Sequence, residues 1–382
     1  MRAPVREENW RSAELNLVKM DSEGGEKKKG RRRGLKERLD AGETILCAEG
    51  YLLAFVRSGY VLQGLWVPEF VLDYPDVLRQ QHYEFVRAGS DVTEAYQYHT
   101  NRTMMERISG QDRTEEINRI AIKIAREVAD ETGTLCAGGL SSTNLFKFSD
   151  SPSDEDPTEK VKKIFEEQVR WSKEEGADYI IAETMWSLAE AKVAVEVIIS
   201  SGLPAVVTLS VRNLRKKDGV YATHDGVAIP EACCQLVELG ATLVGVNCSQ
   251  GPANMIEVVE QIVKVVPPEK VCALPIAYRT TSEQPTWQVF ADKGYPKNNP
   301  AYPNGLEPFY VTRMEIVEFT KRCLELGLRY IGICCGNTGS YTRAMAEAMG
   351  KESVLCKYHT RAATAQAAVE DFMEKVHATV GE

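Results

Sequence analysis

Residues 238–248 read ELGATLVGVNC, and residues 325–336 read ELGLRYIGICCG. In both stretches glycine follows the end of a predicted helix, and a short apolar run follows the glycine. This order is expected where a helix gives way to a buried strand. Each apolar run ends in cysteine, at Cys248 in the first stretch and at Cys334 and Cys335 in the second. The two stretches predict a repeated helix–strand unit that brings thiols to the ends of its strands.

The same succession recurs along the chain. Glycine ends a predicted helix before an apolar run at Gly89, Gly133, Gly176, Gly202, Gly240 and Gly327. Two further apolar runs, at 44–48 and 271–276, bring the candidate strands to eight. Their nearly continuous apolar character is typical of a parallel sheet buried on both faces. Eight such units over roughly 300 residues predict an α/β TIM barrel, with a doubly wound open sheet as the alternative. No Gly-x-Gly-x-x-Gly motif follows the first strand, so nothing indicates a dinucleotide site.

Composition narrows the class of protein. The 382 residues carry a formal net charge of -9 and are 43% hydrophobic. This indicates a soluble globular protein and makes nucleic acid an improbable main partner. No apolar run is long enough to cross a bilayer, so we expect no membrane partner. The ten cysteines lie mostly inside apolar periodic segments. Such a distribution favours free thiols in a reducing compartment, and we expect a cytoplasmic protein.

Three regions are expected along the chain: a disordered tail at 1–34, the barrel at 35–350 and a helical extension at 351–382. The tail lacks hydrophobic periodicity, and its basic cluster at 27–33 fits either a solvated extension or a nuclear localisation signal. Residues 362–376 have the pattern of one amphipathic helix.

The active site of a TIM barrel lies at the C-terminal ends of its strands. This rule places Cys248, Cys334 and Cys335 on one face. Three thiolates suit a soft metal such as zinc and leave one tetrahedral position open for a substrate. Glycines at 332 and 336 permit the irregular backbone that neighbouring ligands require.

The other cysteines are interpreted differently, because a buried cysteine is usually a small hydrophobic residue. We assign that role to Cys47, Cys136, Cys272, Cys323 and Cys356. The neighbours Cys233 and Cys234 lie in a helical stretch, where we expect one core and one surface position.

The motifs as a set resemble the homocysteine S-methyltransferase family, with the betaine-dependent enzymes most similar. The resemblance covers about 35–350 and is carried by Gly245-Val246-Asn247-Cys248, Ile331-Gly332-Ile333-Cys334-Cys335-Gly336, Ile108-Ser109-Gly110-Gln111, Ile181-Ala182-Glu183 and Gly305-Leu306-Glu307-Pro308. It implies that Zn²⁺ binds the three thiols named above and that the thiolate of homocysteine attacks a methyl group to give methionine. Because zinc deprotonates a coordinated thiol, no separate protein base is assigned.

The resemblance also implies residues that bind homocysteine. Glu183 matches a carboxylate that binds the amino group. The family's second acid, an aspartate, corresponds to Ala48, and the nearest carboxylate is one place further on at Glu49. Neighbouring residues on a strand can point to opposite faces of the sheet, so a carboxylate at position 49 need not face the same way as one at position 48. Amino-group recognition is therefore either rebuilt around Glu49 or weakened, and both readings stay open.

The methyl-donor pocket departs further from the family pattern. Trp66 and Tyr98 match aromatic walls that would bind a quaternary ammonium, whereas His99 and Thr184 replace tyrosines. His99 fits either a fourth zinc ligand in the absence of substrate or an ordinary loop histidine. Residues 283–304 are predicted to form a lid over the donor with Trp287, Tyr295 and Tyr302.

Three functions therefore stay open. The first is methyl transfer from betaine to homocysteine. The second uses a sulfonium donor such as S-methylmethionine, or another thiol acceptor. The third is a zinc-binding barrel with impaired catalysis and a regulatory role. A homo-oligomer also stays open, because the long C-terminal arm that makes subunit contacts in the betaine enzymes has no counterpart in 351–382.

Overall fold

The computed structural model describes residues 32–61, 67–108, 112–146, 156–211, 216–217, 219–291, 301–302 and 305–351. The chain divides into two units, 1–33 and 34–382, and the second contains every element below. The predicted basic tail and the predicted helix at 362–376 lie outside the described residues.

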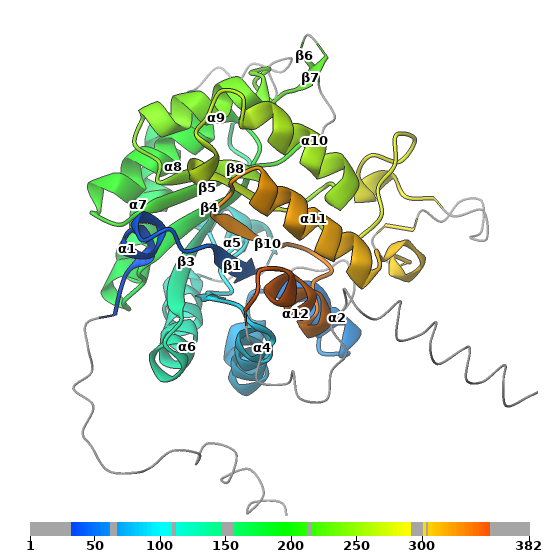
Figure 1. Cartoon of the computed structure of the whole chain (residues 1–382). Coiled ribbons are helices and arrows are strands. Elements are labelled where there is room, and N and C mark those ends of the chain that lie inside the picture. Colours follow the sequence, from blue (N-terminus) through cyan, green and yellow to red (C-terminus); the bar gives the residue numbers. More distant parts are fainter. Residues whose placement is uncertain are drawn as a thin grey trace, which may run out of the picture. The chain divides into compact units, whose positions relative to one another are not determined.

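Eight parallel strands form one sheet, and helices surround it (Figure 1). The strands are β1 (Ile45–Ala48), β2 (Val92–Glu94), β3 (Leu135–Ser141), β4 (Tyr179–Met185), β5 (Ala205–Leu209), β8 (Leu243–Asn247), β9 (Val271–Leu274) and β10 (Tyr330–Ile333). All eight coincide with the predicted apolar runs. A two-stranded hairpin, β6 (Lys216–Lys217) and β7 (Val220–Tyr221), was not predicted, because two-residue strands leave no periodic signal.

The order of the strands identifies the fold. It runs β1-β10-β9-β8-β5-β4-β3-β2, so the first and last strands of the chain pair directly. The β1–β10 register runs from Ile45 opposite Tyr330 to Ala48 opposite Ile333. Between β1 and β2, the Asp91 N–H donates to the Leu46 carbonyl at 2.8 Å. This nearly closed sheet confirms the predicted TIM barrel and excludes the doubly wound sheet.

The helices alternate with the strands as predicted. They are α1 (Leu35–Asp40), α2 (Tyr51–Arg57), α3 (Phe70–Asp73), α4 (Pro75–Ala88), α5 (Arg102–Ile108), α6 (Thr114–Thr132), α7 (Thr158–Glu174), α8 (Leu188–Ser200), α9 (Ile229–Glu238), α10 (Pro252–Ile262), α11 (Arg313–Glu325) and α12 (Gly339–Ala348). Short 3₁₀ turns cover Pro268–Lys270, Trp287–Val289 and Glu307–Phe309. The six glycines predicted to end helices all have positive φ, from 77° to 115°.

Two apolar layers stabilise the barrel. Alternate strand residues fill its interior, such as Ile45 and Cys47 on β1, and the residues between them pack against the helices, such as Leu46 and Ala48. This alternation fixes the face of each side chain at a strand end.

Most of the cysteines lie where expected. The predicted core cysteines Cys47, Cys136, Cys272 and Cys323 are buried, and Cys356 lies outside the described residues. On α9, Cys233 is buried and Cys234 is half-buried, as predicted for one core and one surface position.

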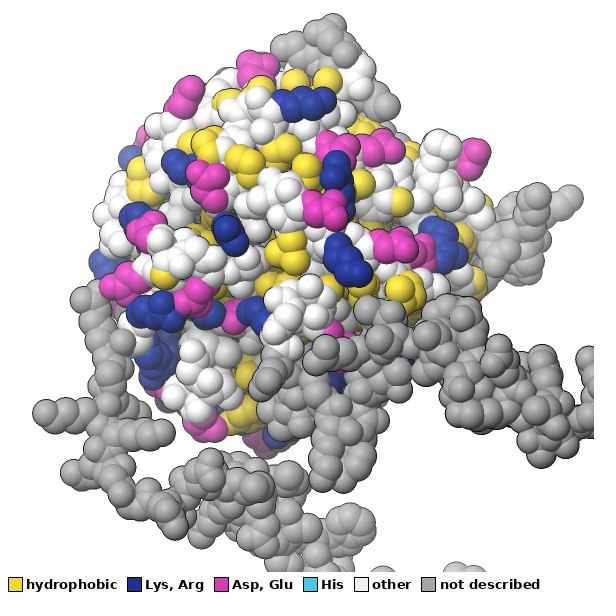
Figure 2. All heavy atoms as spheres, viewed as in Figure 1, with side chains coloured by type: hydrophobic (Ala, Val, Ile, Leu, Met, Phe, Trp, Pro, Cys, Tyr) yellow, Lys and Arg dark blue, Asp and Glu magenta, His cyan; other side chains and the backbone are white. Residues whose placement is uncertain are grey.

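On the face in view, the described residues carry charges of both signs. Lys and Arg side chains lie beside Asp and Glu side chains across the helices (Figure 2). Within the described part of the chain, no helix is long and apolar enough to span a membrane.

Candidate active site

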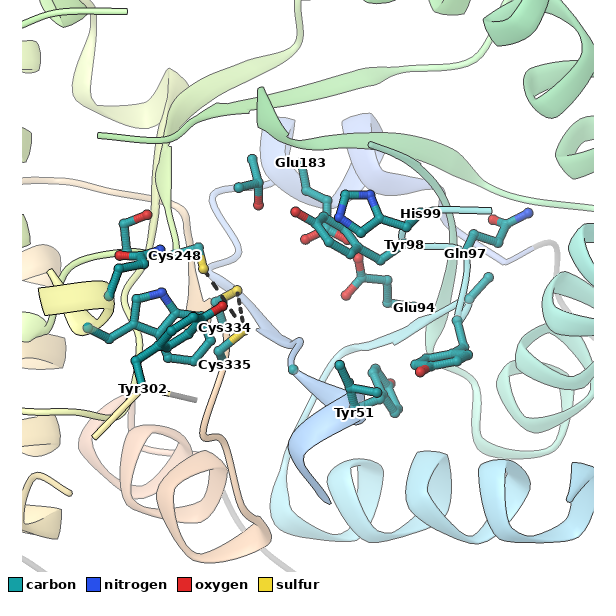
Figure 3. Close-up of a pocket in the computed structure, with 18 residues that line it drawn as sticks. Tyr51, Glu94, Gln97, Tyr98, His99, Glu183, Cys248, Tyr302, Cys334 and Cys335 are labelled. Carbon is teal, nitrogen blue, oxygen red and sulfur yellow. Dashed lines mark hydrogen bonds between the residues drawn. The ribbon is translucent and has the colours of Figure 1, made fainter. Parts of the chain in front are cut away.

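A cavity with about 870 Å³ of empty space, including its open mouth, lies at the C-terminal ends of the strands. Its walls combine the three predicted thiols with two carboxyl groups and several aromatic rings (Figure 3). It is the location that the barrel rule predicts for an active site.

The structure brings the three predicted thiols together. The Sγ atom of Cys335 lies 3.9 Å from that of Cys248 and 3.9 Å from that of Cys334. All three sulfurs lie within 4.8 Å of one another. A tetrahedral zinc with Zn–S bonds of about 2.3 Å places its sulfur ligands about 3.8 Å apart. The separations are too long for a disulfide and fit this tetrahedral edge.

The ionisation of these thiols requires a cation. Hydrogen bonds to the thiols of Cys248 and Cys335, followed by burial, raise the pKa of Cys334 well above 9.0. The pKa of Cys335 is also raised well above 9.0, first by the hydrogen bond with Cys248 and then by burial, although the hydrogen bond with Cys334 opposes this. Thiols packed this closely cannot all become thiolates unless a metal compensates their charge.

The backbone around the thiols is irregular, as predicted, although not only at glycine. Gly336 has φ 82°, and Cys248 itself has φ 57°. Gly332 serves a different purpose, because an added Cβ would lie 2.0 Å from the Cys47 carbonyl oxygen. It therefore allows β10 to approach β1 closely.

Asn247, the last residue of β8, connects the parts of the site. Its Nδ2 lies 3.3 Å from Glu49 Oε2, 3.5 Å from Glu183 Oε2 and 3.8 Å from Cys334 Sγ. Its Oδ1 accepts the Thr184 N–H at 2.9 Å. The sequence interpretation gave Asn247 no role, although it lies inside the GVNC motif. Its strand-end position beside Cys248 was the available signal.

Three carboxyl groups gather next to the thiols. Glu49, Glu94 and Glu183 are 1%, 4% and 9% exposed. Burial raises the pKa of Glu49 from 4.5 to about 8, although Asn247 opposes this. Burial, followed by the charges of the neighbouring glutamates, raises the pKa values of Glu94 and Glu183 well above 4.5. Glu94 was not predicted as a site residue, and the only signal for it was its place at the end of β2.

The structure shows which side chain of the Ala48–Glu49 pair faces the site. Ala48 packs outward against the helices, whereas the Glu49 carboxylate lies within 4.8 Å of Glu183 and Cys334. Glu49 is not, however, among the described residues that line the cavity, whereas Glu94 and Glu183 are.

The predicted donor-pocket residues Tyr98, His99 and Thr184 all line the cavity, and Trp66 lies outside the described residues. From the predicted lid, Trp287 and Tyr302 line the cavity with ring centroids 5.3 Å apart, whereas Tyr295 is not described. The backbone N–H of Trp287 donates to the Ser249 carbonyl at 3.2 Å, and this bond fixes the position of the 3₁₀ turn.

His99 lies with Tyr98 on the other side of the cavity from the thiols (Figure 3). The two rings are 4.1 Å apart, and the His99 backbone N–H donates to Ser141 Oγ at 2.9 Å. Within the described ranges, the cluster of potential metal ligands around Cys248 does not include His99. This placement favours the loop-histidine reading.

Unusual backbone conformations concentrate at this end of the barrel. The non-glycine residues with positive φ in the described ranges all lie in the last two residues of a strand or in the loop after it: His99, Asn144, Thr184, Cys248 and Ser249. Such conformations cost free energy and are typical of functional sites.

Comparisons with known proteins point to one family. Residues 56–349 match the family model described as homocysteine S-methyltransferase. Betaine–homocysteine S-methyltransferase 1 from Xenopus laevis is 35% identical over 85% of this chain and 77% of that protein. The S-methylmethionine–homocysteine S-methyltransferase from Pongo abelii is 32% identical over 85% of this chain and 83% of its own length. Among solved structures, the metallated homocysteine methyltransferase from Escherichia coli has a TM-score of 0.60 at 14% identity, covering 81% of this chain and 98% of that one.

Proposed function

The chain belongs to the homocysteine S-methyltransferase family, and from this membership we propose that it transfers a methyl group from betaine to homocysteine, giving methionine and dimethylglycine. The observation that carries the proposal is a thiol triad with tetrahedral spacing that shares one cavity with buried carboxyl groups and aromatic rings.

Cys248, Cys334 and Cys335 are the proposed Zn²⁺ ligands. Bound zinc would supply the Lewis acidity that keeps the homocysteine sulfur in its nucleophilic thiolate form. The Asn247 amide group, 3.8 Å from Cys334 Sγ, would orient that ligand from outside the coordination sphere.

Glu183 and Glu49 are proposed to attract the amino group of homocysteine. Glu49 Oε1 is buried and has no hydrogen-bond partner among the described residues. No Lys or Arg is among the described cavity-lining residues, so the side chains of this wall offer the carboxyl groups no cation. An ammonium group of the substrate would supply the missing positive charge.

Aromatic side chains would place the donor. Trp287, Tyr302 and Tyr98 offer ring faces for the quaternary ammonium of betaine, beside His99 and Thr184. The buried indole N–H of Trp287, which has no partner in the described ranges, is available to the donor carboxylate. Holding the methyl carbon in line with the sulfur lets the S–C bond form as the N–C bond breaks.

One observation favours a sulfonium donor as the second candidate. The described cavity-lining residues include Glu94 and Glu183 but no basic side chain other than His99. S-Methylmethionine carries one net positive charge, whereas betaine is neutral overall, so an acidic cavity favours the sulfonium compound.

Two measurements test the proposal together. The reduced protein should contain one zinc per chain, and Cys335→Ser should lose zinc and activity, while the half-buried thiol control Cys234→Ser keeps both. A panel of donors with homocysteine should then give methionine with betaine. Activity only with sulfonium compounds would assign the second donor, and zinc without any active donor would favour the regulatory alternative. Full zinc occupancy in Cys335→Ser would contradict the assigned ligands.

A further inference from the structure

Glu94 is the acidic residue of the cavity for which no role has yet been given. It ends β2, is 4% exposed and lines the cavity together with Glu183 from β4. Glu183 is close enough to contribute, after burial and Glu49, to the raised pKa of Glu94. A Glu94 oxygen also lies within 4.8 Å of a Glu49 oxygen. In Figure 3 the side chains of Glu94 and Glu183 point toward each other beside Tyr98.

Two adjacent buried carboxyl groups are stable only if a proton or a cation lies between them. The described residues that line the cavity include no lysine and no arginine. A primary ammonium group fits the place, because it carries a positive charge and three N–H donors that two carboxylates can share.

Betaine, the donor proposed above, fits this pair less well. A quaternary ammonium or a sulfonium centre has no N–H to donate, and aromatic faces recognise it instead. Trp287 and Tyr302 provide such faces elsewhere in the cavity. Of this pair, Glu183 also approaches the thiols that would bind the acceptor sulfur, since one of its oxygens lies within 4.8 Å of Cys334 Sγ.

We infer that Glu94 and Glu183 together bind the primary amino group of the thiol acceptor, and that Glu94 thereby restricts the acceptor to α-amino thiols. The inference deepens the proposed function and rests on it. Glu49 accepts a hydrogen bond from Asn247 and does not line the described cavity, so it is not assigned to this pair.

Binding of two thiols tests this assignment without turnover. Titration calorimetry with reduced, zinc-containing protein would compare homocysteine with 4-sulfanylbutanoic acid, which lacks only the amino group. The wild type should bind homocysteine more tightly. Glu94→Gln should lower that preference about 10- to 100-fold, because it removes one charge-assisted hydrogen bond to the amino group. Affinity for the deaminated thiol should change little.

The outcomes separate this inference from the proposed function. If neither thiol binds the wild type, both are wrong. If homocysteine binds and Glu94→Gln leaves the preference unchanged, or if it alters only the KM of the donor, the role of Glu94 is wrong and the methyltransferase proposal stands.

Two further variants control for folding. Glu94→Asp keeps the charge and should retain most of the preference, even if Glu94→Gln folds poorly. Glu190→Gln changes another buried glutamate, 1% exposed, which is bonded to Ser142 and Thr143 outside the cavity lining. Glu190→Gln should reduce stability but leave the preference for homocysteine unchanged. If Glu190→Gln also loses the preference, the effect of Glu94→Gln is due to general destabilisation and not to the amino-group contact.

Discussion

Acidic side chains have different partners at the two ends of the barrel. At the N-terminal end, Asp91 accepts the Leu46 N–H at 2.7 Å and pairs with Arg38 at 2.9 Å. Asp178 repeats this arrangement with the Cys136 N–H at 2.7 Å and with Arg126 at 3.0 Å.

At the C-terminal end, the carboxyl groups have fewer partners. Glu49 keeps one buried oxygen without a hydrogen-bond partner in the described residues, and one Asn247 amide serves Glu49, Glu183 and Cys334. Asp91 and Asp178 thus have cationic partners within the chain, whereas we propose that a bound ligand compensates the carboxyl groups at the C-terminal end. Variants at the first end should therefore change stability, and variants at the second should change binding and turnover.

The largest effect is expected at the N-terminal end. Asp91→Ala should lower the free energy of unfolding by about 3 kcal/mol, because the Leu46 N–H and Arg38 lose a partly buried, charged partner. Denaturant unfolding would measure this. The kcat/KM of the folded protein should stay near the wild-type value, and a selective rise in the KM for homocysteine would break the division between the two ends.

Asn247→Asp, at the C-terminal end, should change metal binding or turnover more than stability. The new carboxylate keeps the shape of the side chain but replaces the amide N–H donors and faces Glu49 and Glu183. We expect a 10- to 100-fold fall in zinc affinity or kcat/KM, about 1.4–2.8 kcal/mol, as for other groups that orient metal ligands. Asn254→Asp makes the same change on α10, where Asn254 accepts a bond from Thr280, and should have no such effect.

The barrel and the thiol triad could be predicted from the sequence because their signals are local. Glycines such as Gly240 and Gly327 mark helix ends, and each thiol follows its own strand. The alternation of side chains along β1 also explains why Glu49, and not Ala48, faces the interior, although the start of the alternation was not known from sequence.

The roles of Glu94 and Asn247 depend on contacts between strands far apart in the chain. Nothing in residues 92–94 indicates that the Glu94 carboxyl group will meet Glu183, because that contact exists only when the barrel closes. Asn247 lies in a recognisable motif, but its four-way hydrogen bonding depends on the register of its neighbours. The identity of the methyl donor was equally hard to predict, because the residues on the donor side of the cavity come from separate loops.

Trp287→Ala tests whether the donor and the acceptor bind to different walls of the cavity. Removing the ring should weaken donor binding by about 1–2 kcal/mol, a 5- to 30-fold rise in the donor KM, because a cation–π face is lost. The KM for homocysteine should change less, since the amino group lies with the carboxyl pair. Val289→Ala, in the same turn but 47% exposed, is the matched control. Equal rises in both KM values would mean that Trp287 shapes the whole cavity and not the donor wall.

The smallest effect concerns His82 on α4, which links the helical layer to the cavity. Its Nδ1 lies 3.0 Å from the hydroxyl of Tyr51, a cavity-lining residue. Burial, with a smaller effect of Arg79, lowers the pKa of His82 from 6.5 to about 3. Between pH 3 and pH 6.5 the imidazole of His82 is protonated in the unfolded chain but not in the folded protein. The contribution of neutral His82 to the free energy of unfolding is therefore fully present above pH 6.5 and is lost as the pH falls toward 3. From pH 8 to pH 6 it should cost about 0.8 kcal/mol of unfolding free energy. Denaturant unfolding at both pH values should show a smaller pH dependence in His82→Phe than in the wild type, and identical slopes would mean that His82 is protonated in the folded protein as readily as in the unfolded chain.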